Sequence, residues 1–138
     1  MLTGRCQCEG VRFSISGKLG PAGFCHCKQC RRANGSAFAS NAPVRTQYFK
    51  VNQGDDLIRE FESSPNKFRA FCSRCGSPIY SRHASEPEIR RIRLGTLEDD
   101  PGRKPLAHLW VSAKASWYTI EGDLPCFAEG PDGPRAAR

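Results

Sequence analysis

Eight cysteines in 138 residues constrain the fold of this chain more than any other feature. Seven of them form a triplet and two pairs: Cys25, Cys27 and Cys30; Cys6 and Cys8; and Cys72 and Cys75. Cys126 stands alone near the end of the sequence. The two distant pairs together supply the four ligands of a tetrahedral metal ion, whereas the triplet supplies only three. The pattern therefore predicts one closed metal site and one site with an open position.

Disulfide bonds are the alternative use of eight cysteines, and they require an oxidising compartment. The first residues, from Met1 to Arg5, lack the apolar core of a secretory signal, so we expect a reducing, cytoplasmic location. Cysteines two apart, such as Cys6 and Cys8, also bond to each other only with strain. No apolar run approaches the roughly 20 residues of a membrane span, so no membrane partner is expected. Spacing and compartment together favour metal binding.

The net charge of +7 suggests a nucleic-acid partner at first sight. Seven metal-bound thiolates remove seven charges and two zinc ions add four, which leaves +4, because coordinating thiols are deprotonated. The basic residues are scattered, and no aromatic-basic RNA signature is present. The basic segment from Lys67 to Phe71 is interpreted as a half-buried strand, with a phosphate-binding stripe as the alternative. A nucleic-acid partner is therefore not expected.

Short alternating segments separated by turn residues predict a mainly β fold with little helix. Val11, Phe13 and Ile15 alternate with polar residues and predict a strand with one buried face. Further strands are expected at 36–40, 47–51, 57–63, 67–71, 78–81, 89–97 and 108–111, with a break at Pro43 and one helical turn at 28–33. We find no repeat and expect a single domain over residues 1–131, followed by a disordered tail at 132–138.

The two pairs suit a structural site. In an extended segment residues i and i+2 face the same way, so Cys6 and Cys8 can reach one ion from a strand. Cys72 and Cys75 bracket a tight turn, and Gly76 after them permits unusual backbone angles. Four thiolates without an open position are typical of structural zinc, and a rubredoxin-like iron site is the alternative.

The triplet resembles a catalytic site, which typically has three protein ligands and an exchangeable fourth position. Water, a substrate thiolate or a distant residue can fill that position; the candidate residues are His26, His83, His108 and Cys126. We interpret His26 as pointing away from the ion, His83 as a surface residue, His108 as a core residue and Cys126 as a buried free thiol. Three thiolates leave the ion electron-rich, so it should favour a soft fourth ligand. The triplet therefore predicts thiol chemistry more than hydrolysis.

Several motifs together resemble one known family. They are Gly4-Arg5-Cys6-Gln7-Cys8, Cys25-His26-Cys27-Lys28-Gln29-Cys30-Arg31-Arg32, Phe71-Cys72-Ser73-Arg74-Cys75-Gly76-Ser77-Pro78, Leu94-Gly95-Thr96-Leu97, His108-Leu109-Trp110-Val111, Lys114-Ala115-Ser116-Trp117 and Leu124-Pro125-Cys126-Phe127. In order and spacing these motifs resemble the glutathione-dependent formaldehyde-activating enzymes, over roughly residues 3 to 131.

The resemblance implies a β-tent, in which small antiparallel sheets meet at a structural zinc. It assigns that zinc to Cys6, Cys8, Cys72 and Cys75, and a catalytic zinc to Cys25, Cys27 and Cys30. It also implies the activity of an S-(hydroxymethyl)glutathione synthase, a carbon–sulfur lyase that condenses glutathione with formaldehyde. The glutathione thiolate would occupy or approach the open zinc position and attack the carbonyl carbon.

Three alternatives stay open beside this expectation. Lys28, Arg31 and Arg32 pair with the carboxylates of glutathione or form a solvated surface. The enzyme uses glutathione and formaldehyde, or another small thiol or electrophile. The chain is an enzyme, or it is a non-catalytic zinc module that binds a protein or a nucleic acid, since the family also contains centromere protein V. Fold and ligands transfer between relatives more readily than the reaction does.

Overall fold

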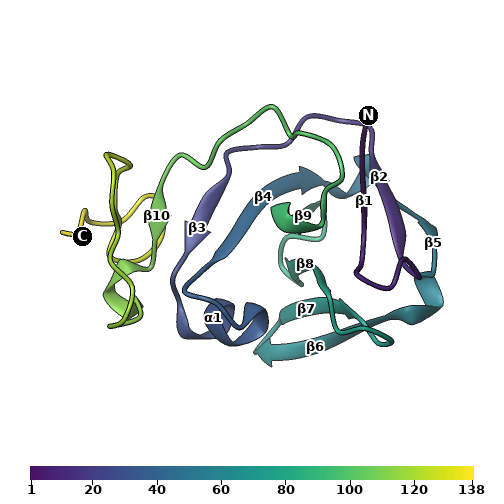
Figure 1. Cartoon of the computed structure of the whole chain (residues 1–138), viewed down its shortest axis with the longest axis horizontal. Coiled ribbons are helices and arrows are strands. Elements are labelled where there is room, and N and C mark those ends of the chain that lie inside the picture. Colours follow the sequence, from purple (N-terminus) through teal and green to yellow (C-terminus); the bar gives the residue numbers. More distant parts are fainter.

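The computed structural model describes residues 1–138 and shows a mainly β protein with one α-helix (Figure 1). The strands are β1 (Leu2–Arg5), β2 (Arg12–Ile15), β3 (Gly23–Cys25), β4 (Ala39–Arg45), β5 (Phe49–Gln53), β6 (Ile58–Ser64), β7 (Lys67–Cys72), β8 (Pro78–His83), β9 (Ile89–Arg93) and β10 (His108–Leu109). The helix α1 spans Lys28–Asn34, and short 3-10 turns lie at Thr46–Tyr48, Asp55–Leu57, Leu94–Thr96 and Val111–Ala113. The prediction of a mainly β fold with little helix is confirmed.

The strands form two sheets. The smaller has the order β1-β2-β5, and the larger has the order β10-β3-β4-β9-β8-β7-β6. All neighbouring strands are antiparallel except β10, which pairs parallel with β3. In Figure 1 the small sheet lies at the right, the segment after β10 lies at the left, and α1 lies below β3 and β4.

The main hydrophobic core combines residues of both sheets. Val11, Phe13 and Ile15 are fully buried, which confirms the predicted one-sided strand. They belong to the same core cluster as Ile79 and Ile92 of the large sheet. Burial of each such side chain is worth roughly 1.5–3 kcal/mol. The core therefore holds the two sheets together.

The predicted break at Pro43 is wrong, because β4 runs through this residue and pairs Pro43 with Arg91 of β9. The Pro43 carbonyl accepts a hydrogen bond of 2.7 Å from the Gly20 N–H, which lies in the loop before β3. The nitrogen and carbonyl of one strand residue face the same neighbour, so the Pro43 nitrogen faces that loop. No hydrogen bond to β9 is lost, and proline is tolerated.

Other boundaries also differ from expectation. The strands expected at 36–40, 47–51 and 89–97 are Ala39–Arg45, Phe49–Gln53 and Ile89–Arg93. The strand expected at 108–111 ends at Leu109, because Trp110 adopts a left-handed conformation with φ of 59°. The helical turn expected at 28–33 extends to Asn34, and Gly35 ends it with φ of 60°, as the sequence predicts. Within residues 132–138, the segment expected to be a disordered tail, the Ala136 N–H donates to the carbonyl of Cys126 over 2.9 Å.

Candidate active site and metal centres

The two cysteine pairs meet where the turn of the small sheet approaches the large sheet. Cys6 and Cys8 lie in the turn between β1 and β2, while Cys72 ends β7 and Cys75 lies in the turn before β8. All four sulfur atoms lie within 4.8 Å of one another. The prediction of an extended segment at Cys6 and Cys8 is wrong, because Gln7 and Cys8 form a turn in which the Glu9 N–H donates to the Cys6 carbonyl over 3.1 Å. The turn nevertheless brings both sulfurs to one point.

Hydrogen-bond donors surround this four-cysteine group. The Val11 N–H donates to Cys6 Sγ over 3.2 Å, and Arg74 Nε donates to Cys8 Sγ over 3.2 Å. Burial raises the pKa of Cys6 to about 11, whereas hydrogen bonds from the Gly10 backbone and from Arg74 lower the pKa of Cys8. Sulfur atoms that receive N–H donors are suited to carry the negative charge of metal-bound thiolates.

The triplet forms at the junction of a strand and a helix. Cys25 ends β3, Cys27 is the N-cap of α1, and Cys30 lies in the first turn of the helix. Cys27 Sγ accepts a hydrogen bond from the Cys30 N–H over 3.3 Å. The three sulfur atoms lie within 4.8 Å of one another. The strand-to-helix transition therefore gathers on one side three side chains that a continuous strand would separate.

None of the four candidates for a distant ligand joins either cysteine group. His26 is fully buried and its Nε2 lies 2.8 Å from Nδ1 of His108, which is also buried. Burial lowers the pKa of His26 to about 4. Cys126 is buried in a small apolar cluster with Val111. His83 lines the pocket described below, with its Nδ1 2.6 Å from Ser85 Oγ.

Two buried arginines lie beside the triplet, and the sequence interpretation missed them. Arg69 of β7 is 9% exposed and donates to Cys30 Sγ over 3.6 Å, while Arg93 of β9 is 4% exposed and bonds to Asn41 Oδ1. Hydrogen bonds with Cys25 and Cys27, and then the charges of both arginines, lower the pKa of Cys30. The triplet is therefore set in a positive environment.

Side chains from β6 and α1 hold Arg69 in place. Arg69 donates from Nε to Ser63 Oγ over 3.0 Å and from its second terminal nitrogen to Gln29 Oε1 over 3.3 Å. Ser63 Oγ in turn donates to Gln29 Oε1 over 2.9 Å. The strand period places Arg69 on the face of β7 that carries Lys67 and Phe71, opposite the buried Ala70 and Cys72. That face reads in the sequence as the exposed one, so no local signal indicates that Arg69 is buried.

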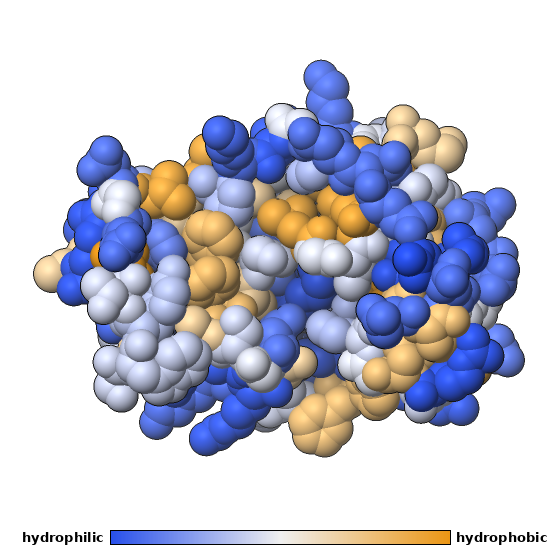
Figure 2. All heavy atoms as spheres, viewed as in Figure 1, coloured by the Kyte–Doolittle hydropathy of each residue, from blue (hydrophilic) through white to orange (hydrophobic).

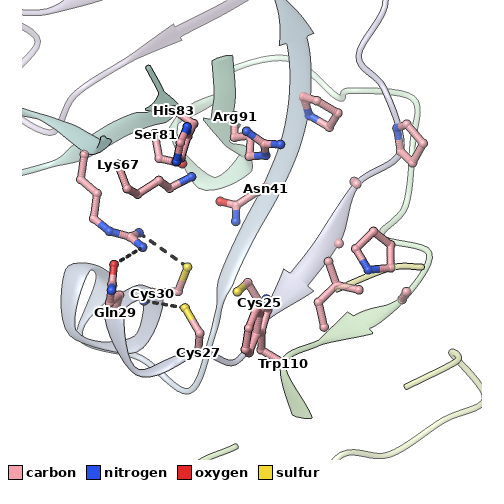
Figure 3. A pocket seen from close by; sticks show the side chains of 18 of the residues that line it. Cys25, Cys27, Gln29, Cys30, Asn41, Lys67, Ser81, His83, Arg91 and Trp110 are labelled. Carbon is pink, nitrogen blue, oxygen red and sulfur yellow. Dashed lines mark hydrogen bonds between the residues drawn. The ribbon is translucent and has the colours of Figure 1, made fainter. Parts of the chain in front are cut away.

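The triplet opens into a pocket of about 910 Å³ (Figure 3). One wall carries polar and cationic side chains from β7, β8, β9 and α1, including Lys28, Lys67, Ser81, His83 and Arg91. In Figure 3, Lys67, Arg91 and Asn41 lie on one side of the three sulfurs, and Trp110 lies beside Cys25 on the other. The space-filling view shows the face of the molecule hollowed near its middle, with apolar and hydrophilic residues around the hollow (Figure 2).

The charges of this wall influence each other. Burial, and then the positive charges of Arg91, Arg69 and Arg93, lower the pKa of Lys67 to about 8. Arg91 is partly neutralised by Glu86, whose carboxylate lies 3.2 Å away. Lys28, Arg31 and Arg32 are the candidates for carboxylate binding that the sequence leaves open against a solvated surface, and only Lys28 lines this pocket. Arg31 and Arg32 line a separate hollow of about 290 Å³ beside Trp117, which Lys28 also borders.

These features define a class of protein, mainly β, with two all-sulfur groups able to hold metal ions, one of which opens into a pocket. The sequence model of the family described as "Glutathione-dependent formaldehyde-activating enzyme" matches residues 1–113. The chain belongs to that family, as its motifs predict. None of its helices has the length and apolar character of a membrane span.

Individual relatives agree with this assignment. A protein of Halomonas elongata named "Putative glutathione-dependent formaldehyde-activating enzyme" is 32% identical over 142 residues, which cover 96% of this chain and 90% of that protein. The crystal structure of a Rhodobacter sphaeroides protein superposes with a TM-score of 0.61 at 24% identity, covering 75% of this chain and 97% of that one. The second similarity concerns the fold alone. The general function of the family, glutathione-dependent activation of formaldehyde, agrees with the function that the sequence predicts.

Proposed function

We propose that this chain is a zinc-dependent carbon–sulfur lyase of the S-(hydroxymethyl)glutathione synthase type, working in the condensing direction. The observation that carries the proposal is the position of Cys25, Cys27 and Cys30, whose sulfurs converge at a pocket with a cationic wall. A module that only binds a protein or a nucleic acid has no need of such a pocket beside three converging thiols.

The donor chemistry of both groups fits zinc. Each group consists of thiols alone, and soft thiolate ligands are typical of zinc sites. We propose that Cys25, Cys27 and Cys30 hold one zinc ion and that Cys6, Cys8, Cys72 and Cys75 hold a second. A zinc ion in the triplet would keep a substrate thiol deprotonated near neutral pH. Arg69, through its contact with Cys30, would balance the negative charge of three thiolates.

The cationic wall supplies the recognition of glutathione. Glutathione carries two carboxylates, and Lys28 and Lys67 are the lysines that line the pocket. We propose that these side chains bind the carboxylates and so orient the thiol toward the three cysteines. The glutathione sulfur then adds to the carbonyl carbon of formaldehyde. A carbon–sulfur bond forms, the π electron pair moves to oxygen, and the oxygen takes a proton from solvent.

The four-cysteine group has a structural role in this proposal. It connects the turn after β1 with the turn after β7, so an ion there would tie the two sheets of the β-tent together. We further propose that residues 1–131 form the single catalytic domain and that the protein works in the cytoplasm. Seven of the eight cysteines would serve as metal ligands in this proposal, and thiols kept for metal binding suit a reducing compartment.

Zinc content and glutathione binding of Cys27→Ser and Cys27→Ala test the proposal. The wild type should hold two zinc ions per chain and bind glutathione. Both variants should keep the fold, lose one zinc ion and lose glutathione binding, since each lacks one thiolate of the triplet. Serine can still cap α1 where Cys27 Sγ accepts from the Cys30 N–H, so it separates the loss of a ligand from the loss of a helix cap.

Cys126→Ala is the matched control, because this cysteine is buried but belongs to neither group. It should keep both zinc ions and glutathione binding. A wild-type protein with only one zinc ion, or one without affinity for any small thiol, would contradict the catalytic role of the triplet and favour a non-catalytic zinc module.

A further inference from the structure

The wall of the pocket opposite the cationic side chains is apolar. It is formed by residues before β3, around β10 and near residue 131: Pro21, Leu106, Leu109, Trp110 and Pro131. Leu106 is 56% exposed and Trp110 is 39% exposed. Large apolar side chains that face a pocket while remaining open to water indicate a ligand group that covers them.

Neither substrate of the proposed reaction covers this wall. Glutathione carries two carboxylates, an ammonium group and two amides, so it suits the cationic wall. Formaldehyde has a carbonyl group without any carbon substituent. The pocket volume of about 910 Å³ lies at the upper end of the range for drug-sized ligands. An electrophile with an apolar substituent would use this wall, whereas formaldehyde leaves it in contact with water.

The apolar wall also lies beside the cysteine triplet, where the glutathione sulfur would react. Leu109 is the register partner of Cys25 in the parallel pairing of β10 with β3. Trp110 follows it, and Figure 3 shows the Trp110 side chain beside Cys25, across the sulfurs from Lys67. A thiol held from the cationic side would therefore bring a bound carbonyl carbon between the two walls, with its substituent toward Leu109 and Trp110.

The backbone holds Trp110 in this place by an unusual conformation. Its φ of 59° is a genuine outlier for a bulky residue, and such conformations cluster at ligand-binding and active sites. The Trp110 N–H donates to the Glu129 carbonyl over 2.9 Å, and the Val111 N–H donates to the Phe127 carbonyl over 3.0 Å. The segment at 127–129 thus fixes the turn that presents the indole to the pocket.

From these observations we infer that the preferred electrophile is an aldehyde with an apolar substituent, bound against Leu106, Leu109 and Trp110. The inference rests on the proposed function and specifies its substrate class. The thiol of glutathione first loses its proton to solvent. Its thiolate sulfur then adds to the carbonyl carbon, one carbon–sulfur bond forms, the π pair moves to oxygen, and oxygen takes a proton from solvent. The product is a hemithioacetal of glutathione, and no oxidant or reductant is needed.

The test compares formaldehyde, acetaldehyde, butanal and hexanal as partners of glutathione in the zinc-loaded protein. Exchange NMR measures adduct formation with and without enzyme, and each kcat/KM is divided by the uncatalysed rate constant for the same aldehyde. The normalised value should be about tenfold or more higher for hexanal than for acetaldehyde, because each methylene in an apolar pocket contributes to discrimination. Trp110→Ala and Leu106→Ala should lower the ratio of hexanal to formaldehyde.

Trp117→Ala is the matched control, because Trp117 lines the separate hollow and is 71% exposed. It should leave the ratio unchanged. Catalysis with formaldehyde, without an increase in the normalised kcat/KM from acetaldehyde to hexanal, would overturn the inference while the proposed function stands. An unchanged ratio in Trp110→Ala and Leu106→Ala, with a gain in the wild type, would also overturn it. Absence of catalysis with every aldehyde would overturn the proposed function and the inference together.

Discussion

Replacement of Arg69 by methionine should weaken zinc binding at the triplet and leave the four-cysteine group unchanged. Arg69 is buried and donates to Cys30 Sγ over 3.6 Å. Methionine removes the charge and the donors but keeps an unbranched side chain of similar length. Ser63 and Gln29 remain hydrogen-bonded to each other over 2.9 Å, so the variant leaves this polar pair satisfied and should fold.

The expected loss of zinc affinity follows from the contact between Arg69 and Cys30. A full charge pair 4 Å apart is worth about 4 kcal/mol at an effective dielectric constant of about 20, which sets an upper bound. Arg93 remains as a second buried cation, so the expected loss is that of a hydrogen bond to a charged group, about 1.5–3 kcal/mol. This corresponds to an affinity for zinc about 10- to 100-fold lower, the range found for outer partners of metal ligands.

Competition with a chromophoric zinc chelator under anaerobic conditions measures the two sites of one molecule separately. The four-cysteine group serves as the internal control. Arg59→Met is the matched variant, since Arg59 is exposed and donates only to the backbone carbonyls of Asp56 and Ile58. If the triplet of Arg69→Met binds zinc as tightly as that of the wild type, or if both groups weaken equally, the assigned role of Arg69 is refuted.

Three further predictions concern binding, metal loading and the core. The pKa of Lys67 is lowered to about 8, so this side chain loses its positive charge as the pH rises through 8. Binding of S-methylglutathione, measured by calorimetry, should weaken over the same range. Lys67→Met should lose this part of the pH dependence. The unfolded lysine keeps its proton up to its ordinary pKa of 10.5. The contribution of Lys67 to the free energy of unfolding therefore rises with pH between about 8 and 10.5. Cys75→Ala should lose the structural zinc and unfold, which circular dichroism and zinc analysis would detect; a folded variant with two zinc ions would contradict the ligand set. Ile79→Ala should lower the unfolding free energy in urea by about 2–5 kcal/mol, because Ile79 is fully buried, whereas the exposed Phe61→Ala should change it little.

The sequence predicts much of the candidate site because cysteine spacing is a local signal. A CxxC segment brings two sulfurs together through a tight turn, and the structure has that turn between Cys72 and Cys75, with Gly76 at φ of 79°. Alternation predicts the buried face of β2 for the same reason, since strand period is a property of neighbouring residues. The local sequence does not predict the role of Pro43, because its effect depends on which neighbouring segment its nitrogen faces, and the sheet order decides that.

The walls of the pocket were not predicted, because each combines residues from distant segments. Lys67, Arg69 and Arg91 read in the sequence as basic residues of half-buried strands. They lie near the cysteine triplet only because β9, β8 and β7 are neighbours in the large sheet, and the local sequence does not specify this strand order. Trp110 reads as part of an apolar strand, and its left-handed conformation depends on hydrogen bonds made by the segment at 127–129.

Sequence alone determined the chemistry that is available to this protein: seven cysteines at metal-ligand spacing, a mainly β fold and the family. These follow from residue type and short-range geometry, which the chain carries with it in any tertiary arrangement. Tertiary structure decided what surrounds the thiols: the buried arginines at Cys30, the cationic wall and the apolar wall beside Trp110. The physical reason is that burial, electrostatic environment and pocket shape arise from side chains brought together across strands, and no local pattern specifies them.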